Sequence, residues 1–289
     1  MSDLRPMQAV ARATRRAVPQ LAPPAKQLLW RSVYEIMSLG KRDLGTTLMN
    51  YGFASLDPSA EQSTDAQPGA DDRFGLELYA EVAGAAELSG RDVLEVGCGR
   101  GGGASYVFER FSPRSMTGLD LARQAIERCR ARYARRGLEF VAGNAEQLPF
   151  ADGAFDAVLS VESTHCYANP SNFLRETIRV LRPGGLLLLA DLRSTEPTED
   201  GIFAREDVGQ LRTQLANAGF RTLAEEDITA NVVRALELDT PVRRARIEQR
   251  APKLLRRHVL GFAAVEGSPV YKAFAERQLT YLRFVLEKP

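Results

Sequence analysis

Two polar side chains in the middle of the chain have the types and the spacing to act together on a proton. His165 follows one short apolar run, and Asp191 ends the next. If these runs form neighbouring parallel strands, both residues lie at the same edge of a sheet. A neutral histidine can take a proton from a hydroxyl group, and a carboxylate beside it fixes which ring nitrogen carries a hydrogen. We therefore predict His165 and Asp191 as catalytic residues, together with Glu162 shortly before them.

Each of these residues also has a simpler interpretation. His165 could pack in the core or cap a helix, and Glu162 could make a structural hydrogen bond under its loop. If the molecule that reacts at this site carries a carboxylate instead of a hydroxyl, it is already ionised at neutral pH and needs no base. His165 would then only position it. Tyr51, Tyr79 and Tyr167 are candidates for lining a substrate pocket, with core packing as the alternative.

A glycine-rich stretch earlier in the chain could hold a nucleotide-like ligand. Gly97, Gly99 and Gly101 have the spacing G-x-G-x-G, directly after a predicted strand and before a predicted helix. Glycines allow a tight turn there and let a ligand approach the backbone closely. Gly97, Gly99 and Gly102 also fit the dinucleotide pattern, so the loop alone leaves both cofactor classes and a ligand-free turn open.

Two further side chains end the next predicted strands. The carboxylate of Asp120 can accept both hydrogen bonds from a ribose diol, which both cofactor classes contain. The amide of Asn144 can pair with the edge of an adenine ring. The sequence has no Tyr-x-x-x-Lys or other group of residues for hydride transfer. This disfavours an NAD-dependent oxidoreductase, while a cofactor-binding protein without activity stays open.

The elements that must position these residues alternate between short apolar runs and helical patterns, which predicts βαβ units and a parallel sheet. The predicted strands are 92–96, 115–119, 138–142, 155–161, 185–191, 220–227 and 279–286, and the helices between them are 102–111, 122–135, 170–181 and 205–218.

The remaining segments are predicted as helical additions to this core. Amphipathic patterns predict helices at 25–39 and 73–87, separated by a polar, flexible segment at 57–72. We therefore predict a poorly ordered N-terminus (1–24) and one domain (25–289), made of a helical cap (25–90), a cofactor-binding core (91–228), substrate-cap helices (229–277) and a final strand (278–289).

The stretches EVGCGRGGG, GLDL, GNAEQLPF, FDAVLSVES and VLRPGGLLLLAD, in this order, resemble the successive motifs of class I S-adenosylmethionine-dependent methyltransferases. The resemblance implies a Rossmann-like α/β fold with a seven-stranded sheet whose last strand is antiparallel. It implies S-adenosylmethionine as cofactor and S-adenosylhomocysteine as product. It also assigns roles: Glu95, Gly97, Gly99 and Gly101 for the methionine end, Asp120 for the ribose, Leu121, Asn144 and Ala145 for the adenine, and Ser160 or Val161 for the cofactor floor.

A second resemblance extends over nearly the whole chain. The stretches VESTHCY, ADLR and the ending AVEGSP…YKAFAERQLTYLRFVLEKP are similar to phthiotriol/phenolphthiotriol dimycocerosates methyltransferases and to fatty-acid O-methyltransferases. This likeness implies O-methylation of a hydrophobic lipid or polyketide-type hydroxyl, or of a fatty-acid carboxyl. The alternative is C-methylation of a prenyl or sterol-like chain, in which Glu162 and His165 would stabilise a cation and remove a proton.

Composition sets the remaining bounds. A net charge of +1 gives no global attraction to nucleic acid, and no run approaches the roughly 18 apolar residues of a membrane span. With two histidines and three cysteines we expect no metal site and a reducing cytoplasm. The arginines between 243 and 257 fit a solvated helix face or contact with an anionic lipid surface, and a homodimer stays open.

Overall fold

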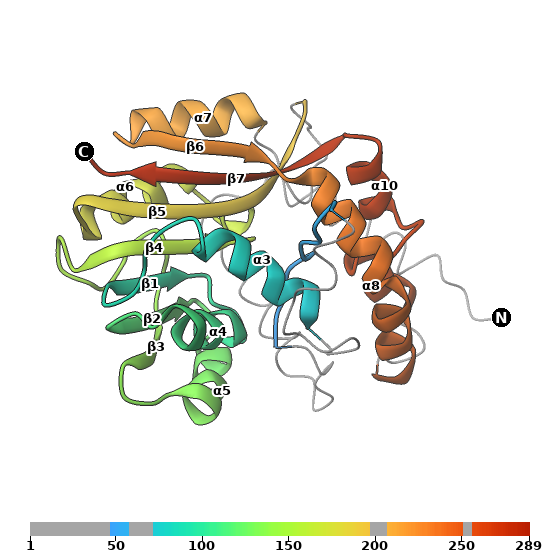
Figure 1. Ribbon diagram of the computed structural model, residues 1–289, viewed down its shortest axis with the longest axis horizontal. Coiled ribbons are helices and arrows are strands. Elements are labelled where there is room, and N and C mark those ends of the chain that lie inside the picture. The colour runs from blue at the N-terminus through green and yellow to red at the C-terminus, as the bar shows by residue number, and fades with distance from the viewer. Residues whose placement is uncertain (1–46, 58–71, 197–206, 251–255) are drawn as a thin grey trace.

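The computed structural model describes residues 47–57, 72–196, 207–250 and 256–289. Its centre is a seven-stranded sheet with the strand order β3-β2-β1-β4-β5-β7-β6 (Figure 1). The last strand, β7, is antiparallel to both of its neighbours, and the other pairs are parallel. The predicted α/β fold with an antiparallel last strand is therefore confirmed. The predictions for 1–24 and 25–39, and most of that for 57–72, lie outside the described residues.

Every predicted strand is present. The strands are β1 (Asp92–Val96), β2 (Ser115–Asp120), β3 (Leu138–Ala142), β4 (Phe155–Val161), β5 (Leu181–Ser194), β6 (Arg221–Asp227) and β7 (Leu279–Glu287). Strand β5 begins earlier than predicted, because a register shift against β4 absorbs the Pro-Gly-Gly turn within the strand. Gly184 makes this turn with a φ of +72°, a conformation that favours glycine.

The described helices are α3 (Arg73–Ala83), α4 (Gly102–Phe111), α5 (Arg123–Tyr133), α6 (Pro170–Val180), α7 (Val208–Asn217), α8 (Thr229–Arg250), α9 (Arg256–Phe262) and α10 (Pro269–Ala275), with a 3-10 turn η3 (Thr164–Cys166). Helix α3 ends before Glu87, where the prediction had placed its end. Its last i→i−4 hydrogen bond runs from Gly84 to the Ala80 carbonyl, and the next bond, from Ala86 to Ala83, already belongs to a tighter turn. Within the described part of 229–277, which was predicted as substrate-cap helices, the chain forms α8, α9 and α10.

The central strands are covered by helices on both faces, which explains why they read as continuous apolar runs. On β5, Leu187 and Leu189 belong to the core that includes residues of α6 and α7. Leu188 and Ala190 point to the opposite core, which includes residues of α3, α4 and α5. The alternation assigns a face to every residue of β5, because successive side chains of a strand point to opposite sides.

The carboxyl ends of the parallel strands lie at the right in Figure 1, where α8 and α10 lie beyond the sheet.

At this edge, side chains of α8 hold segment 47–57 in place. Arg243, with a side chain 13% exposed, pairs with Asp239 and donates to the carbonyls of Asn50 and Tyr51 at 3.3 and 3.0 Å. Arg246 lies 3.7 Å from Asp72. Arg243 and Arg246 are therefore bound to other residues of the protein. They do not belong to the solvated or lipid-facing surface that was expected for the arginines between 243 and 257.

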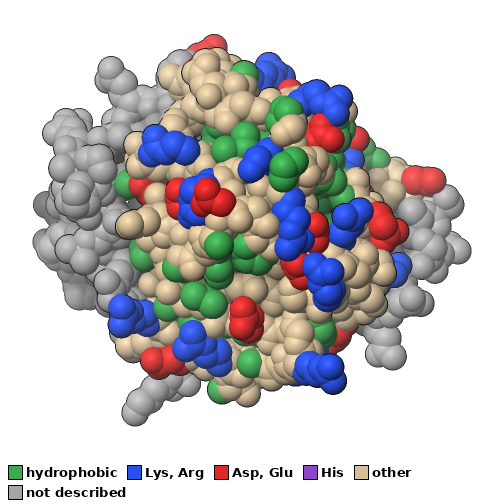
Figure 2. All heavy atoms as spheres, turned by 90° about the vertical axis from the view of Figure 1, so that its left-hand side faces the viewer, with side chains coloured by type: hydrophobic (Ala, Val, Ile, Leu, Met, Phe, Trp, Pro, Cys, Tyr) green, Lys and Arg blue, Asp and Glu red, His purple; other side chains and the backbone are tan. Residues whose placement is uncertain are grey.

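The opposite edge of the sheet carries interspersed basic and acidic side chains (Figure 2). Arg182 there bridges Asp92 and Asp156, at 2.9 and 2.7 Å. These three side chains are half-buried and tie the starts of β1, β4 and β5 together. Among the described residues, no helix is both long enough and apolar enough to cross a membrane.

Gly103 in α4 should be intolerant of any side chain. A Cβ at this position would lie 2.0 Å from the Tyr79 ring, and the Tyr79 hydroxyl is held by Glu95. We expect Gly103→Ala to lower the free energy of unfolding by about 1–3 kcal/mol, measured by urea denaturation. The matched control is Gly261→Ala in α9, where nothing lies within 4 Å; it should be neutral or stabilising by up to about 1 kcal/mol. Equal effects of the two substitutions would contradict this packing.

Candidate active site

A cleft with about 990 Å³ of empty space opens at the carboxyl edge of the sheet. Its walls come from the ends of β1, β2 and β4, the turns that follow them, α3 and segment 47–57. The predicted site residues that line it are Tyr79, Gly97, Gly99, Asp120, Leu121, Asn144, Ala145, Val161, Glu162 and Tyr167. The sequence therefore located one continuous cavity from residues that are far apart in the chain.

The glycine loop turns at the end of β1 through three glycines in the left-handed region, with φ of +82° at Gly97, +53° at Gly99 and +78° at Gly101. A Cβ at Gly97 would lie 2.5 Å from the Ser163 Cβ, and one at Gly101 would lie 2.9 Å from Cys129 Sγ. A Cβ at Gly99 would meet only the end of the Met49 side chain, at 3.6 Å. Gly97 and Gly101 therefore pack against the protein, and Gly99 faces the space of the cleft.

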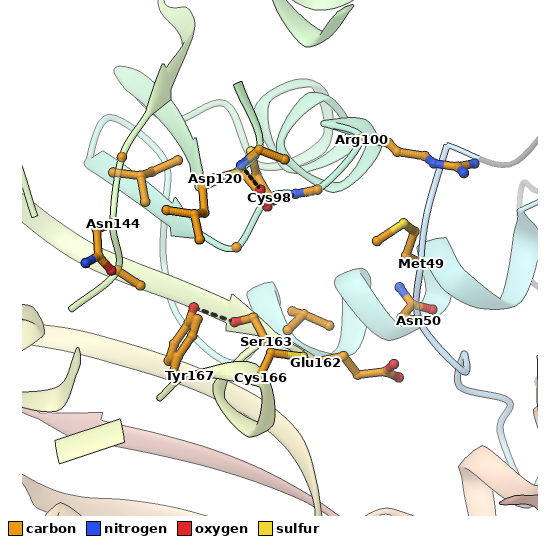
Figure 3. A pocket seen from close by; sticks show the side chains of 18 of the residues that line it. Met49, Asn50, Cys98, Arg100, Asp120, Asn144, Glu162, Ser163, Cys166 and Tyr167 are labelled. Carbon is orange, nitrogen blue, oxygen red and sulfur yellow. Dashed lines mark hydrogen bonds between the residues drawn. The ribbon is translucent and has the colours of Figure 1, made fainter. Parts of the chain in front are cut away.

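Asp120 stands opposite this loop at the end of β2. Its carboxylate accepts the backbone amides of Gly99 and Ala122, both at 2.9 Å. Burial raises the pKa of Asp120, and these backbone amides oppose the rise. Asp120 and Asn144 lie at the same end of the cleft (Figure 3). A carboxylate oxygen has lone pairs for more than one donor, so this end could hold a ribose and an attached base.

Glu95 lies behind the wall of the cleft rather than in it. Its side chain is buried and accepts the Tyr79 hydroxyl at 2.6 Å. Burial raises the pKa of Glu95 to about 7, although the hydrogen bond from Tyr79 opposes this rise. The Tyr79 ring lines the cleft, so Glu95 could act on a ligand through Tyr79. Its predicted role at the methionine end stays a prediction.

The floor of the cleft is a chain of hydroxyl groups. Tyr167 donates to Ser163 Oγ at 2.9 Å (Figure 3), and Ser163 Oγ lies 2.7 Å from Ser160 Oγ. Ser160 is fully buried beneath this contact, whereas Ser163, which we did not predict, faces the cleft together with the predicted Val161. These hydrogen bonds hold Ser163 in place against Gly97, so that position 97 has no room for a side chain.

Glu162 adopts a φ of +48°, which is uncommon for a residue other than glycine and is often found at functional sites. Its Oε1 accepts the Tyr51 amide at 2.6 Å and the Tyr281 hydroxyl at 2.9 Å. The carboxylate extends toward the end of the cleft where Met49 lies (Figure 3). Burial raises the pKa of Glu162 to about 7, although the Tyr51 amide opposes this rise. A carboxyl group with such a pKa can exchange a proton near neutral pH.

His165 and Asp191 meet as their positions at two strand ends predicted. His165 Nδ1 lies 2.7 Å from Asp191 Oδ1, and the His165 amide donates to Asp191 Oδ2 at 3.0 Å. Thr164 also donates to Oδ2. The pair is buried behind Cys166 and Glu162, which line the cleft, and the His165 side chain is 8% exposed. The imidazole is therefore held in one orientation by groups of the protein.

The two charges of this pair shift each other's proton affinity. Burial alone would raise the pKa of Asp191, but the positive charges of His165 and Arg193 hold it well below its ordinary value. Burial acts to lower the pKa of His165, yet the neighbouring Cys166 and Asp191 raise it well above its ordinary value. Asp191 is thus a carboxylate near neutral pH, as an orienting group must be.

Tyr51 and Gly101 are not among the residues that line the cleft. The Tyr51 ring packs edge-on against Phe274 at 5.5 Å between ring centroids, and its backbone amide holds Glu162. A role for Tyr51 in binding an acceptor stays a prediction. Asn50 lines the cleft but was not predicted, because the sequence around it contains none of the motifs described above.

Comparisons with known proteins agree with this geometry. A family described as "Methyltransferase domain" matches residues 94–189. A phthiotriol/phenolphthiotriol dimycocerosates methyltransferase of Mycobacterium ulcerans is 39% identical over 79% of this chain and 80% of its own length. The fatty-acid O-methyltransferase of Mycolicibacterium smegmatis is 34% identical over 97% of both chains.

The fold is likewise similar to that of solved structures. The [4+2]-cyclase SpnF superimposes with a TM-score of 0.70 at 24% identity, covering 89% of this chain and 94% of that chain. At this identity the likeness concerns the fold alone. The two mycobacterial relatives, in contrast, are similar enough in sequence and coverage to define the group. The chain therefore belongs to the S-adenosylmethionine-dependent methyltransferases.

Proposed function

We propose that this enzyme transfers the methyl group of S-adenosylmethionine to an oxygen of a hydrophobic acceptor, either a lipid or polyketide-type hydroxyl or a fatty-acid carboxyl. The observation that carries the proposal is the His165–Asp191 pair, buried directly behind Glu162 and Cys166 of the cleft wall. Relatives whose names specify dimycocerosates and fatty acids support a lipid acceptor.

The cofactor would lie along the cleft with its adenosine at the Asp120 end. Asp120 would accept the ribose hydroxyls, while Leu121, Asn144 and Ala145 would surround the adenine. The backbone around Gly99 would accommodate the methionine portion, because no side chain fills that space. In this orientation Tyr79 and Glu162 of the cleft wall would lie on the sulfonium side, next to the proposed base.

When bound, the cofactor supplies an activated methyl group for an in-line displacement. The protein must hold the acceptor oxygen at near-attack distance, roughly 3 Å from that carbon, which can account for a large share of catalysis. The raised pKa of His165 means that the neutral imidazole becomes more abundant as the pH rises. In that neutral form Asp191 would keep the hydrogen on His165 Nδ1, which leaves Nε2 to take the proton of an alcohol. The acceptor oxygen would bond to the methyl carbon as the sulfur–methyl bond breaks, and His165 would hold the hydroxyl proton. Glu162 would orient the hydroxyl or receive the proton afterwards.

Gly99→Asn should separate cofactor binding from folding. Asparagine tolerates a positive φ, and the added side chain would enter the cleft without meeting backbone. We expect the affinity for S-adenosylmethionine, measured by calorimetry, to fall at least about tenfold, equivalent to 1.4 kcal/mol, with an unchanged Tm. Gly153→Asn is the control, because Gly153 also has a positive φ and open space but lies outside the cleft. Unchanged affinity in Gly99→Asn would remove this loop from the cofactor site.

The chain length of the acceptor should govern catalytic efficiency. Each methylene that enters an apolar pocket contributes about 0.8 kcal/mol, so kcat/KM should rise up to about fourfold per methylene until the pocket is full. The measurement is methyl transfer from labelled S-adenosylmethionine to fatty acids and to primary alcohols of increasing length. A flat profile, or a preference for small polar acceptors, would contradict the hydrophobic acceptor and leave the methyltransferase assignment intact.

His165→Ala should distinguish the two acceptor types. With an alcohol, the loss of the base should lower kcat about 100-fold or more, with little change in cofactor affinity. With a fatty acid, which arrives ionised, the loss should be nearer tenfold and should appear partly in KM.

Two further variants test the pair as a unit. Asp191→Asn should act on the same step more weakly, and the double variant should be no worse than His165→Ala, because residues that act together are non-additive. The control is His258→Ala, which changes the other histidine of the chain. Full activity of His165→Ala with every acceptor would rule out both roles.

A further inference from the structure

Arg193 is a fully buried cation that the chemistry described so far does not use. It follows Asp191 by two residues on β5, so the two side chains share the face of Leu187 and Leu189. The side chains of Arg193 and Asp191 are each 1% exposed. Arg193 does not line the cleft, so any part that it plays in the reaction must pass through another residue.

The guanidinium reaches Asp191 by two routes. Directly, Arg193 Nη1 lies 3.4 Å from Asp191 Oδ2. Indirectly, Nη2 donates to Thr164 Oγ1 at 2.7 Å, and Thr164 donates in turn to the same carboxylate oxygen. Nη1 also donates to the Leu192 carbonyl at 2.6 Å. Asp191 therefore has Arg193 on one side and His165 on the other.

Stability alone is a poor reason for this arrangement. Burying an arginine and a carboxylate costs several kcal/mol in desolvation, and apolar residues of similar volume often serve as well. The arrangement makes sense as a balance of charge. One carboxylate, one guanidinium and a neutral imidazole sum to zero, whereas a carboxylate and an imidazole without Arg193 carry an unbalanced negative charge that only a proton on the imidazole can neutralise.

We propose that Arg193 is a positioning residue that acts on His165 through Asp191 and Thr164, balancing the carboxylate so that the imidazole can be neutral and accept a proton while Asp191 stays ionised. The proposal deepens the proposed function and rests on it in one respect, the role of His165 as base. The coupling between Arg193 and His165 can be measured without any acceptor.

The sign of the effect follows from the charges around His165. Asp191 and Cys166 already raise the pKa of His165 well above its ordinary value, against the effect of burial. Without Arg193, the uncompensated carboxylate would raise this pKa further. The other groups around the pair are Glu162 after β4, the phenols of Tyr51 and Tyr281, and Arg243, which acts on Tyr51.

The test is an NMR titration of the full-length protein in a His258→Gln background, in which His165 is the only histidine. Arg193→Met removes the charge and keeps an unbranched side chain. We expect its His165 titration midpoint to rise by about one pH unit or more, the size of shift that a neighbouring charge causes. Arg193→Lys keeps the charge and should move the midpoint by less than about half a unit. An unchanged midpoint in Arg193→Met would overturn the proposal.

Two controls keep this result decisive. Arg283→Met removes another largely buried arginine, on β7, whose partners are Glu226 at 2.6 Å and Glu81 at 3.5 Å, and it should leave the midpoint unchanged. If Arg193→Met does not fold by circular dichroism, Thr164→Val takes its place, because it cuts the hydroxyl bridge and leaves both charges. It should shift the midpoint in the same direction, and no shift in that variant would overturn the proposal as well.

The activity measurement separates positioning from a merely structural role. With a long-chain alcohol as acceptor, the rise of kcat with pH should move to higher pH in Arg193→Met, so that kcat falls about tenfold at neutral pH and recovers at alkaline pH. This follows from a shift of one pH unit. Arg193→Lys should restore the profile. A uniform loss at all pH values would contradict the proposal. An NMR shift together with full activity of His165→Ala would instead refute the base role and retain the coupling.

Discussion

The site depends on one constraint: a carboxylate that is to remain charged inside a protein needs donors from several directions. Asp191 receives them from the imidazole and amide of His165, the hydroxyl of Thr164, its neighbouring Leu192 amide and the guanidinium of Arg193. These groups belong to β5 and to the turn η3 after β4. The two strand ends must therefore stay in register, and their pairing from Ala157 with Leu186 to Val161 with Ala190 provides this. The orientation of the imidazole is a consequence of sheet geometry.

A second regularity concerns two glutamates at the cleft, Glu95 buried behind its wall and Glu162 half-buried in it. Glu95 and Glu162 both have a pKa raised to about 7 by burial, and each accepts a tyrosine hydroxyl, from Tyr79 and Tyr281 respectively. Near neutral pH each can therefore be charged or neutral at small cost. A positively charged ligand in the cleft would favour their ionised forms, since an opposite charge lowers the pKa of a carboxyl.

Much of this could be predicted from the sequence, because the informative residues obey local rules. Strand ends, the G-x-G-x-G turn and Asp120 follow from the alternation of short apolar runs with helical patterns, and the meeting of His165 with Asp191 follows from parallel pairing. The contributions of Asn50 and Tyr281 could not be predicted, since they reach the site through tertiary contacts across more than a hundred residues of sequence. The contact of Arg243 with segment 47–57 could not be predicted either, because nothing in the sequence distinguishes this arginine from the others of α8. Arg193 could have been noticed in the sequence, because it is a cation within an otherwise apolar strand. Its role becomes apparent only from its contact with Asp191, two residues earlier on the same strand.

The fastening of segment 47–57 by Arg243 also bears on the order in which the enzyme becomes competent. The hydrogen bonds from Arg243 to the carbonyls of Asn50 and Tyr51 span 193 and 192 residues, and Asn231 holds the Ala54 carbonyl across 177. During synthesis on the ribosome, these three hydrogen bonds cannot form until α8 has emerged, long after β1 and its glycine loop can fold. Contacts of such long range form late in folding. The contacts of 47–57 with Asp72 and with Gly75 of α3 are local and can form early, so the fastening by α8 is the step that completes this wall of the cleft.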